Sequence, residues 1–157
     1  MIVAVSGHRD VIITPSIRQE LQGFFDGLTQ HHRTIVLLDA LADGADQCVA
    51  EIALKYDNIT LEVPLPLEKT AYIKTIKNKI RFNALLKSAQ KVHSLPARYD
   101  HPYENLGRYL VDRADMLLAL WDGSYNDKIG GTGEVIRYAR TLEKPIVHII
   151  VNRQCAS

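Results

Sequence analysis

Cysteine is scarce in this chain, and no segment has the character of a membrane span. The two cysteines, Cys48 and Cys155, lie far apart and neither belongs to a Cys-x-x-Cys motif. A disulfide framework is therefore excluded, and a cytoplasmic protein is the simplest expectation. No apolar run approaches the roughly 20 residues that a membrane-spanning helix needs. Because Ile2–Val5 already reads as a strand, we expect neither a signal peptide nor a membrane partner.

The chain also lacks the signatures of metal sites and of the common nucleotide-binding loops. The histidines are scattered except for the adjacent His31 and His32. None has the spacing of a metal ligand set, so no metal is expected. No Gly-x-Gly-x-x-Gly turn follows the first strand, and no Gly-Lys-Ser/Thr sequence occurs anywhere. The usual dinucleotide and Walker fingerprints are therefore missing.

Positive and negative charges nearly balance over the whole chain, with 19 lysines and arginines and 18 aspartates and glutamates. The net charge of +1 argues against a protein that mainly coats nucleic acid. One stretch is unbalanced, because no acidic residue occurs from Lys69 to Arg98. Such a stretch is usually a solvated helix face, and DNA binding through it is the alternative. Nucleic acid is therefore not the expected partner.

What the chain does contain is an ordinary globular composition, with 46% apolar and 24% charged residues. The length of 157 residues suits one domain with a sizeable core. We find no internal repeat, low-complexity segment or linker. The sequence therefore predicts a single domain over residues 1–151 and a C-terminal tail over residues 152–157.

Strand-like and helix-like patterns alternate along the chain. Short apolar runs bounded by glycine, proline or polar residues predict strands at residues 2–5, 34–38, 59–63, 92–95, 116–121 and 145–151. Amphipathic patterns predict helices from Thr14–Pro15, after Gly44, across 68–90 with a break near Asn78 or Asn83, at 105–113, and after the glycine turn at 130–133. This alternation predicts an α/β fold, namely a Rossmann-like, doubly wound, mostly parallel sheet of about five to six strands with helices on both faces.

The most informative stretch joins a buried strand to a glycine-rich turn and a helix. Met116–Trp121 predicts the strand, a polar loop runs from Ser124 to Ile129, and the helix follows the turn. That turn consists of Gly130, Gly131, Thr132 and Gly133. Glycines let a backbone approach a phosphate closely, and the amides at a helix N-terminus attract anions. We therefore expect an anion site here, with a flexible helix-capping loop as the alternative.

A second polar turn, made of Ser6, Gly7, His8 and Arg9, follows the first strand. In a dinucleotide-binding fold this is the place of the first phosphate turn. Arg9 could pair with a phosphate, and His8 could donate to a ribose or carry a proton. Alternatively, Arg9 only forms a salt bridge with an aspartate and His8 is a surface residue.

A third turn contains Gly44, Ala45 and Asp46, directly after the second strand. Gly44 would allow a tight turn into the helix, and Asp46 could accept a hydrogen bond from a ribose hydroxyl. An aspartate in a first helical turn is also explained by the helix dipole alone. If strands 2–5 and 116–121 are neighbours, all three glycine turns meet at one rim.

Three further residues at that rim could contact a nucleotide. Trp121 could stack on a base or cover the core, and Asp122 and Glu134 are carboxylates near the expected sugar position. Two such carboxylates could assist cleavage of an N-glycosidic bond. Glu134 could instead only compensate the dipole of its helix.

Several of these runs resemble, in the same order and at similar spacing, runs of the SLOG superfamily. They are Leu41–Asp46, Pro64–Pro66, Arg113–Asp115, Ala119–Gly123 and Gly130–Glu134. The resemblance covers nearly the whole chain and implies a Rossmann-like fold and a homo-oligomer. The superfamily includes LOG-type phosphoribohydrolases, molybdenum-cofactor carrier proteins, DprA-type DNA-processing proteins and nucleotide sensors.

The chain departs from the LOG enzymes in its glycine loop. Ile129 stands in place of the proline before Gly130, Glu134 stands where that motif has threonine, and Arg137 stands where its carboxylate is expected. Arg108 lies near the place of the arginine that those enzymes use. The chain therefore resembles the nucleotide-sensor branch more closely.

The sequence thus predicts a protein that binds a nucleotide or a nucleotide-derived phosphate ligand at the rim of three turns, as a sensor or carrier. An N-glycosidic hydrolase or transferase is the alternative. A weaker resemblance of Gly131–Thr132 and Tyr138–Ala139 to nucleoside 2-deoxyribosyltransferases belongs to that alternative. A DprA-like DNA-binding module is the second alternative.

Overall fold

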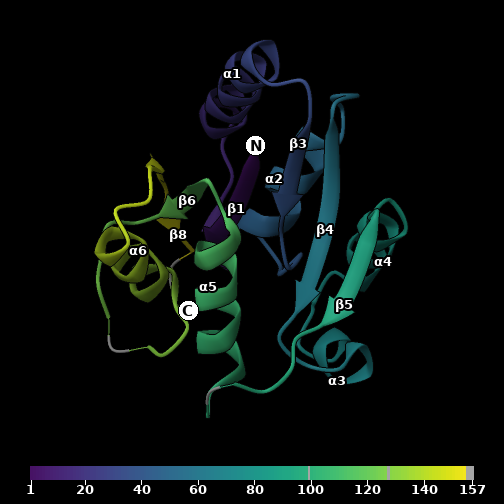
Figure 1. Ribbon diagram of the computed structural model, residues 1–157, viewed down its shortest axis with the longest axis vertical. Helices are drawn as coiled ribbons and strands as arrows, with labels where there is room; N and C mark the ends of the chain where they lie inside the picture. The colour runs from purple at the N-terminus through teal and green to yellow at the C-terminus, as the bar shows by residue number, and fades with distance from the viewer. Residues whose placement is uncertain (99, 127, 155–157) are drawn as a thin grey trace.

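Six parallel strands form the centre of the molecule in the computed structural model, which describes residues 1–98, 100–126 and 128–154 (Figure 1). Their order across the sheet is β5-β4-β3-β1-β6-β7. The strands are β1 (Ile2–Gly7), β3 (Ile35–Leu38), β4 (Ile59–Leu65), β5 (Lys91–Ser94), β6 (Met116–Trp121) and β7 (Ile146–Ile150). The helices are α1 (Pro15–His31), α2 (Ala45–Ala53), α3 (Lys69–Ile73), α4 (Lys79–Lys87), α5 (Pro102–Arg113) and α6 (Thr132–Thr141).

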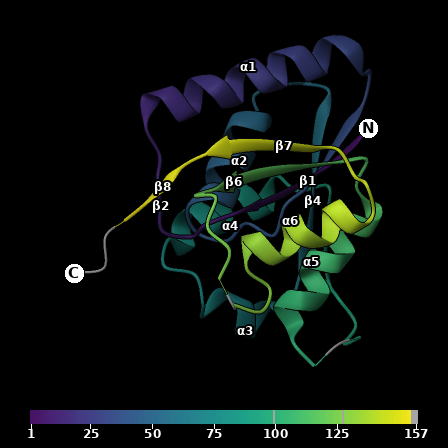
Figure 2. The same ribbon diagram turned by 90° about the vertical axis from the view of Figure 1, so that its left-hand side faces the viewer.

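The sheet is covered on both faces, as the alternation of its side chains requires. Val3 and Val5 of β1 belong to a core shared with α1, α2 and α4. Ala4 between them belongs to a second core with α5 and α6. Figure 2 shows α1 on one side of the strands and α5 and α6 on the other. The predicted Rossmann-like, doubly wound parallel sheet is confirmed.

Helix α1 begins where the sequence predicts. The Thr14 hydroxyl accepts a hydrogen bond from the Ile17 amide at 3.2 Å, and proline occupies the first turn. Ile17, Leu21 and Phe25 then repeat on one buried face. The N-cap and the 3.6-residue period together determine both the start and the orientation of this helix.

The predicted break in the 68–90 region lies between α3 and α4. The Asn78 side chain accepts from the Arg81 amide at 3.1 Å and so caps α4. The Asp43 carboxylate accepts from the amides of Lys77 and Asn78 at 2.8 and 2.9 Å. These bonds satisfy amides that a continuous helix would have paired internally, and they tie this connection to the loop after β3.

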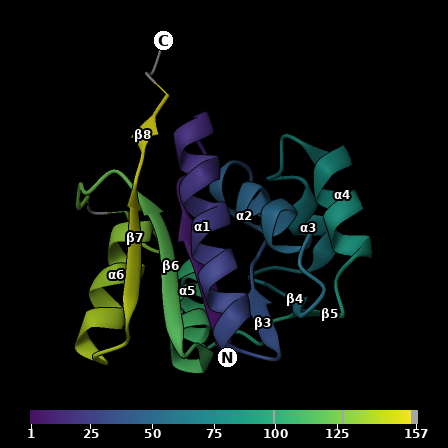
Figure 3. The ribbon, with the colours of Figure 1, turned by 90° about the horizontal axis from the view of Figure 1, so that it is seen from above.

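The end of the chain differs from the expected tail. Residues 152–153 form β8 (Asn152–Arg153), which pairs antiparallel with β2 (Val11–Ile12). The Gln154 amide also donates to the Asp10 carbonyl at 2.8 Å. In Figures 2 and 3, β7 continues past the sheet into β8. The prediction of a tail was wrong for residues 152–154, because they pair with residues 10–12, which lie far away in the sequence. Residues 155–157 lie outside the described part of the chain.

The strand order places a topological switch between β1 and β6. From β1 the chain builds β3, β4 and β5 on one side, then crosses back and adds β6 and β7 on the other. The connections after β1 and β6 therefore diverge, and a crevice opens at their carboxyl ends. In open α/β sheets this is where ligands bind. Among the described residues, no helix is long and apolar enough to span a membrane.

Candidate functional site

A cavity of about 420 Å³ lies at the carboxyl ends of β1 and β6, in the crevice at the topological switch. Its walls come from the loops that follow β1, β3 and β6 and from α2, α3, α5, α6 and β8. Its volume is within the range of small-molecule sites. The predicted site residues that line it are Ser6, Gly7, His8, Arg9, Asp46, Gly130, Gly131, Thr132 and Gly133.

One end of the cavity is formed by the N-terminus of α6. Gly131 is the N-cap residue, and no side chain caps the helix. The amides of Thr132 and Gly133 donate to no other group in the described part of the chain. Their N–H groups and the helix dipole therefore provide the conditions for binding an anion at this end.

Gly130 lets the glycine loop approach the start of α5. Its φ of +75° is unfavourable for other residues, and a Cβ there would lie 2.5 Å from the Tyr103 Cβ. The Gly130 amide donates to the Glu134 carboxylate at 3.3 Å. Glu134 thus folds back onto its own loop and is not among the residues that line the cavity.

The glycines of the other two turns bring β1 and α2 into direct contact. A Cβ on Gly7 would lie 2.3 Å from the Ala45 Cβ, and a Cβ on Gly44 would lie 2.3 Å from the Arg9 carbonyl oxygen. The Ala45 amide donates to the His8 carbonyl at 3.2 Å. Gly44 and Ala45 therefore position the loop after β1 and lie behind the cavity wall.

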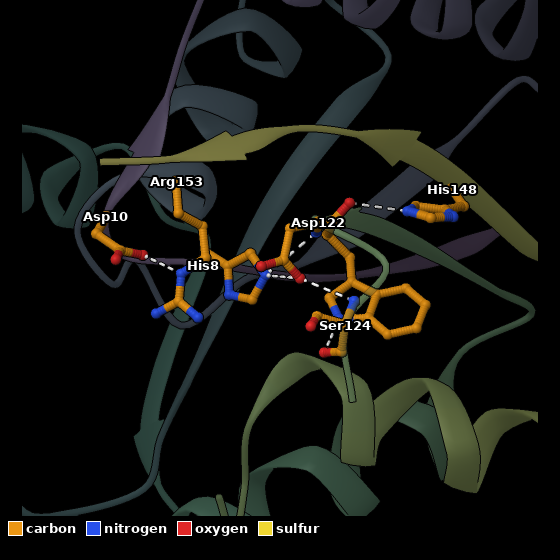
Figure 4. Close-up of polar contacts among 7 residues, drawn as sticks. His8, Asp10, Asp122, Ser124, His148 and Arg153 are labelled. Carbon is orange, nitrogen blue, oxygen red and sulfur yellow. Dashed lines mark hydrogen bonds and ion pairs between the residues drawn. The ribbon is translucent and has the colours of Figure 1, made fainter. Parts of the chain in front are cut away.

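His8 links the cavity wall to the end of β6 (Figure 4). Its Nε2 lies 3.2 Å from both the backbone nitrogen and a carboxylate oxygen of Asp122. A protonated Nε2 donates to the carboxylate, and an unprotonated Nε2 accepts from the amide. Burial and then the charge of Arg153 lower the pKa of His8 from its ordinary value of 6.5, while Asp122 opposes this.

Asp122 faces His8 and its own loop, and it is not among the residues that line the cavity. Its carboxylate accepts from the Ser124 amide at 3.0 Å. Burial raises the pKa of Asp122, but that amide and the neighbouring His8 together hold it below its ordinary range. The Asp122 carboxylate therefore does not face the cavity, where the sequence analysis expected it to lie beside a sugar.

Arg153 is a cavity residue that sequence reasoning missed. It belongs to β8, and its Nε donates to the Asp10 carboxylate at 2.9 Å (Figure 4). Both residues line the cavity. No local pattern could have indicated this, because the contact joins positions 143 residues apart and depends on the β2–β8 pair.

The hydrogen bonds of the Arg9 side chain are with the segment after α3 and not with an aspartate carboxylate. Its guanidinium donates to the Thr75 carbonyl at 3.0 Å and lies near the rings of Tyr72 and Tyr103, at 5.9 and 5.8 Å from their centroids. These contacts hold a permanent positive charge at the cavity wall.

Asp46 is a carboxyl group of the cavity lining, with only 7% of its surface exposed. Burial raises the pKa of Asp46 to about 7, against the effects of a hydrogen bond from the Ala42 amide and of the Arg9 charge. Nearby, Asp39 is fully buried and accepts from the Leu41 amide at 2.8 Å. Burial and the charge of Asp46 raise the pKa of Asp39 well above its ordinary value. Sequence reasoning did not single out Asp39.

The two remaining predicted ligand residues have other neighbours. Trp121 is 3% exposed, belongs to the core beside α5 and α6, and donates from its indole nitrogen to the Ser124 carbonyl at 3.1 Å. Arg108 pairs with Glu104 at 3.3 Å and lies over the Tyr138 ring. Neither is among the cavity-lining residues. The described residues also contain no cluster of side chains suited to a metal ion.

Comparison with known proteins finds solved structures with a similar fold. No family model and no curated protein matches this sequence. DNA processing protein A from Helicobacter pylori has a similar structure, with a TM-score of 0.63 and 18% identity over 94% of this chain. The match covers 64% of that protein, so this chain corresponds to less than two thirds of its length.

Two further solved structures share the same architecture. TM1055, a structural genomics target, has a TM-score of 0.58 with 16% identity, covering 92% of this chain and 71% of its own. The Moco carrier protein from Chlamydomonas reinhardtii has a TM-score of 0.55 with 16% identity, covering 94% and 75%. The chain therefore has the Rossmann-like fold that the SLOG resemblance implied, and these likenesses do not distinguish among the branches.

Proposed function

We propose that the cavity binds a nucleotide or a nucleotide-derived phosphate ligand, and that the protein acts as a sensor or carrier of that ligand. The observation that carries this proposal is the meeting of two predicted turns in one cavity. The glycine loop before α6 and the turn after β1 both line it, at the topological switch of the sheet.

The charge of the cavity supports a phosphate at the α6 end. Thr132 and Gly133 offer backbone amides there, and the lining also includes Arg9, Lys128 and Arg153. A phosphate would gain charge-assisted hydrogen bonds from such groups. Asp46 would then be available to accept a hydrogen bond from a sugar hydroxyl.

The fold relatives support binding of this general kind. One similar structure is a carrier of the molybdenum cofactor by its name, and another concerns single-stranded DNA binding. Both kinds of ligand carry phosphate. A small ligand suits this chain better, because the candidate site is a cavity rather than an extended surface groove.

A thermal-shift panel tests the proposal and the role of Arg153 together. Nucleoside monophosphates and ADP-ribose are the probes, and at least one should raise the melting temperature, because a ligand of the native state stabilises it. Arg153→Gln should weaken binding of that probe by about 10- to 100-fold, since a hydrogen bond to a charged group contributes roughly 1.5–3 kcal/mol.

The matched control is Arg33→Gln, because Arg33 is exposed and lies before β3, at the amino end of the strands. This variant should bind like the wild type. No stabilisation by any probe, or equal weakening in both variants, would count against the proposed site.

An N-glycosidic hydrolase or transferase remains the second candidate, and the observation that favours it is Asp46. A cavity carboxyl whose pKa is about 7 suits general acid–base catalysis at neutral pH. If a nucleoside monophosphate releases free base, Asp46→Asn should abolish release, whereas Glu134→Gln should retain most of it. Chromatographic detection of the base decides this, and the reverse order of effects would favour Glu134 instead.

A further inference from the structure

The side chain of His8 extends the pairing of β1 with β6 past the last residues of the two strands. The His8 amide donates to the Leu120 carbonyl at 3.3 Å. Just beyond β6, the Asp122 amide donates to His8 Nε2 at 3.2 Å (Figure 4). This amide donates to no other group in the part of the chain that the structure describes. Because backbone donors are nearly always paired in folded proteins, Nε2 is the acceptor that this amide requires.

The Asp122 carboxylate is a second candidate partner for Nε2. One of its oxygens lies at the same distance of 3.2 Å and would accept a proton held on that nitrogen. However, this carboxylate already accepts from the Ser124 amide at 3.0 Å, and 24% of the side chain is exposed to solvent. The Asp122 amide has no second acceptor among the described residues, and an unpaired donor costs its full desolvation. An unprotonated Nε2 therefore satisfies more of the network.

An unprotonated Nε2 determines where the proton of the neutral ring lies. A neutral imidazole carries one N–H, so the proton is on Nδ1. Burial is the main cause that lowers the pKa of His8 below 6.5, and this favours the neutral ring. Nδ1 has no hydrogen-bond partner within the described ranges, and it is not among the enclosed polar atoms in that condition. Since His8 lines the cavity, this N–H is open to a bound molecule.

We propose that the Asp122 amide fixes His8 as the neutral tautomer with its proton on Nδ1, and that this N–H donates to a phosphate oxygen of a ligand in the cavity. The second half rests on the proposed function. A hydrogen bond at one ring nitrogen of histidine sets the state of the other. The lining also contains Arg9 and Arg153, whose charges favour an anionic acceptor. His8 thus binds a phosphate without itself becoming charged.

The tautomer can be measured in the protein without any ligand. At about pH 8.5, about two units above the ordinary pKa of the ring, imidazole nitrogen chemical shifts distinguish a protonated from a bare nitrogen. For His8 they should report a proton on Nδ1. His148 is an internal control with the opposite pattern, because its Nε2 lies 2.9 Å from the Trp121 carbonyl, which can only accept. A proton on Nε2 of His8 overturns the assignment.

Asp122→Asn tests what fixes the tautomer. This variant removes the charge of the carboxylate and keeps the backbone amide. If the amide fixes the ring, His8 should keep its proton on Nδ1 in Asp122→Asn. Movement of the proton to Nε2 in this variant would show that the carboxylate determines the tautomer, and it would overturn the role of the amide.

The ligand half is tested by calorimetric titration with AMP at the same pH, where its phosphate does not titrate. An asparagine side chain places its amide nitrogen where Nδ1 lies, whereas a glutamine side chain places it where Nε2 lies. His8→Gln should therefore bind AMP about 10- to 100-fold more weakly, as expected for loss of a hydrogen bond to a charged group. His8→Asn should retain most of the wild-type affinity, and thermal unfolding checks that both variants are folded.

The outcomes separate failure of this inference from failure of the proposed function. Binding of AMP to the wild type with equal weakening in His8→Asn and His8→Gln overturns donation from Nδ1 and leaves the proposed function standing. If neither AMP nor ADP-ribose binds to the wild type, the ligand half fails together with the proposed function for these probes. The nitrogen chemical shifts still decide the tautomer in that case.

Discussion

At the scale of single residues, the site depends on glycines that let neighbouring backbone segments pack directly against each other. Gly7 and Gly44 were expected to face a ligand. Gly7 lines the cavity, yet both glycines also allow β1 and α2 to meet, as their contacts with Ala45 and Arg9 show. Asp46 lies in the first turn of α2, so the position of this carboxyl depends on the same approach.

Gly7→Ala should destabilise the protein by about 1–3 kcal/mol, the usual cost of overpacking. The new methyl would lie 2.3 Å from the Ala45 Cβ, so α2 would have to move. Gly23→Ala is the matched control, because a Cβ there meets nothing within 4 Å. In the α1 interior it should add up to about 1 kcal/mol of stability. Urea unfolding measures both, and equal effects would contradict the packing described here.

At the scale of elements, the strands and helices with strong periodicity could be predicted from sequence. The strands β1, β3 and β6 follow from short buried apolar runs, and the start of α1 from Thr14. The strands β2 and β8 could not be predicted, because each has only two residues and exists through pairing with the other. Arg153 therefore appeared in the sequence as part of a tail.

The start of α1 offers a direct test of an element. Thr14→Ala should cost about 1 kcal/mol of unfolding free energy, the usual value for losing an N-cap side chain. Ser16→Ala is the control, because Ser16 is exposed in the first turn and should change stability by less than about 0.5 kcal/mol. Thermal or urea unfolding decides, and a loss of similar size in both variants would mean that the cap is not the cause.

The limits of sequence reasoning at the site have physical causes. The lining by Ser6 to Arg9 and by Gly130 to Gly133 follows from the position of β1 beside β6. The alternation of elements predicts the parallel sheet, but it left the adjacency of these two strands as a condition. The direction of the Glu134 side chain is set by its bond to the Gly130 amide, and the burial of Asp39 depends on the packing around it. A one-dimensional pattern carries no information on such side-chain directions.

At the scale of the whole molecule, the basic stretch from Lys69 to Arg98 is distributed over α3, α4 and β5. Part of its charge is compensated, since Arg81 pairs with Glu51 and Lys91 with Glu62. These pairs reduce the field that a nucleic acid would meet. The cavity at the topological switch instead brings uncapped amides and cations together at one site, which supports it as the proposed centre of function.

Single-stranded DNA should bind no more tightly than a Kd of about 1 μM at physiological salt, the range of non-specific binding. Fluorescence anisotropy with a labelled oligonucleotide at several salt concentrations measures this. Tighter binding that Lys77→Gln and Lys79→Gln weaken would instead identify the basic stretch as a functional surface.

The central claim, that a phosphate-bearing nucleotide binds at the α6 end of the cavity, is tested most directly by an NMR titration with ADP-ribose. Saturable shifts of the Thr132 and Gly133 amide resonances are expected, with smaller shifts around Asp46. Unchanged amides at Thr132 and Gly133 during binding, or shifts confined to residues 69–98, would contradict it.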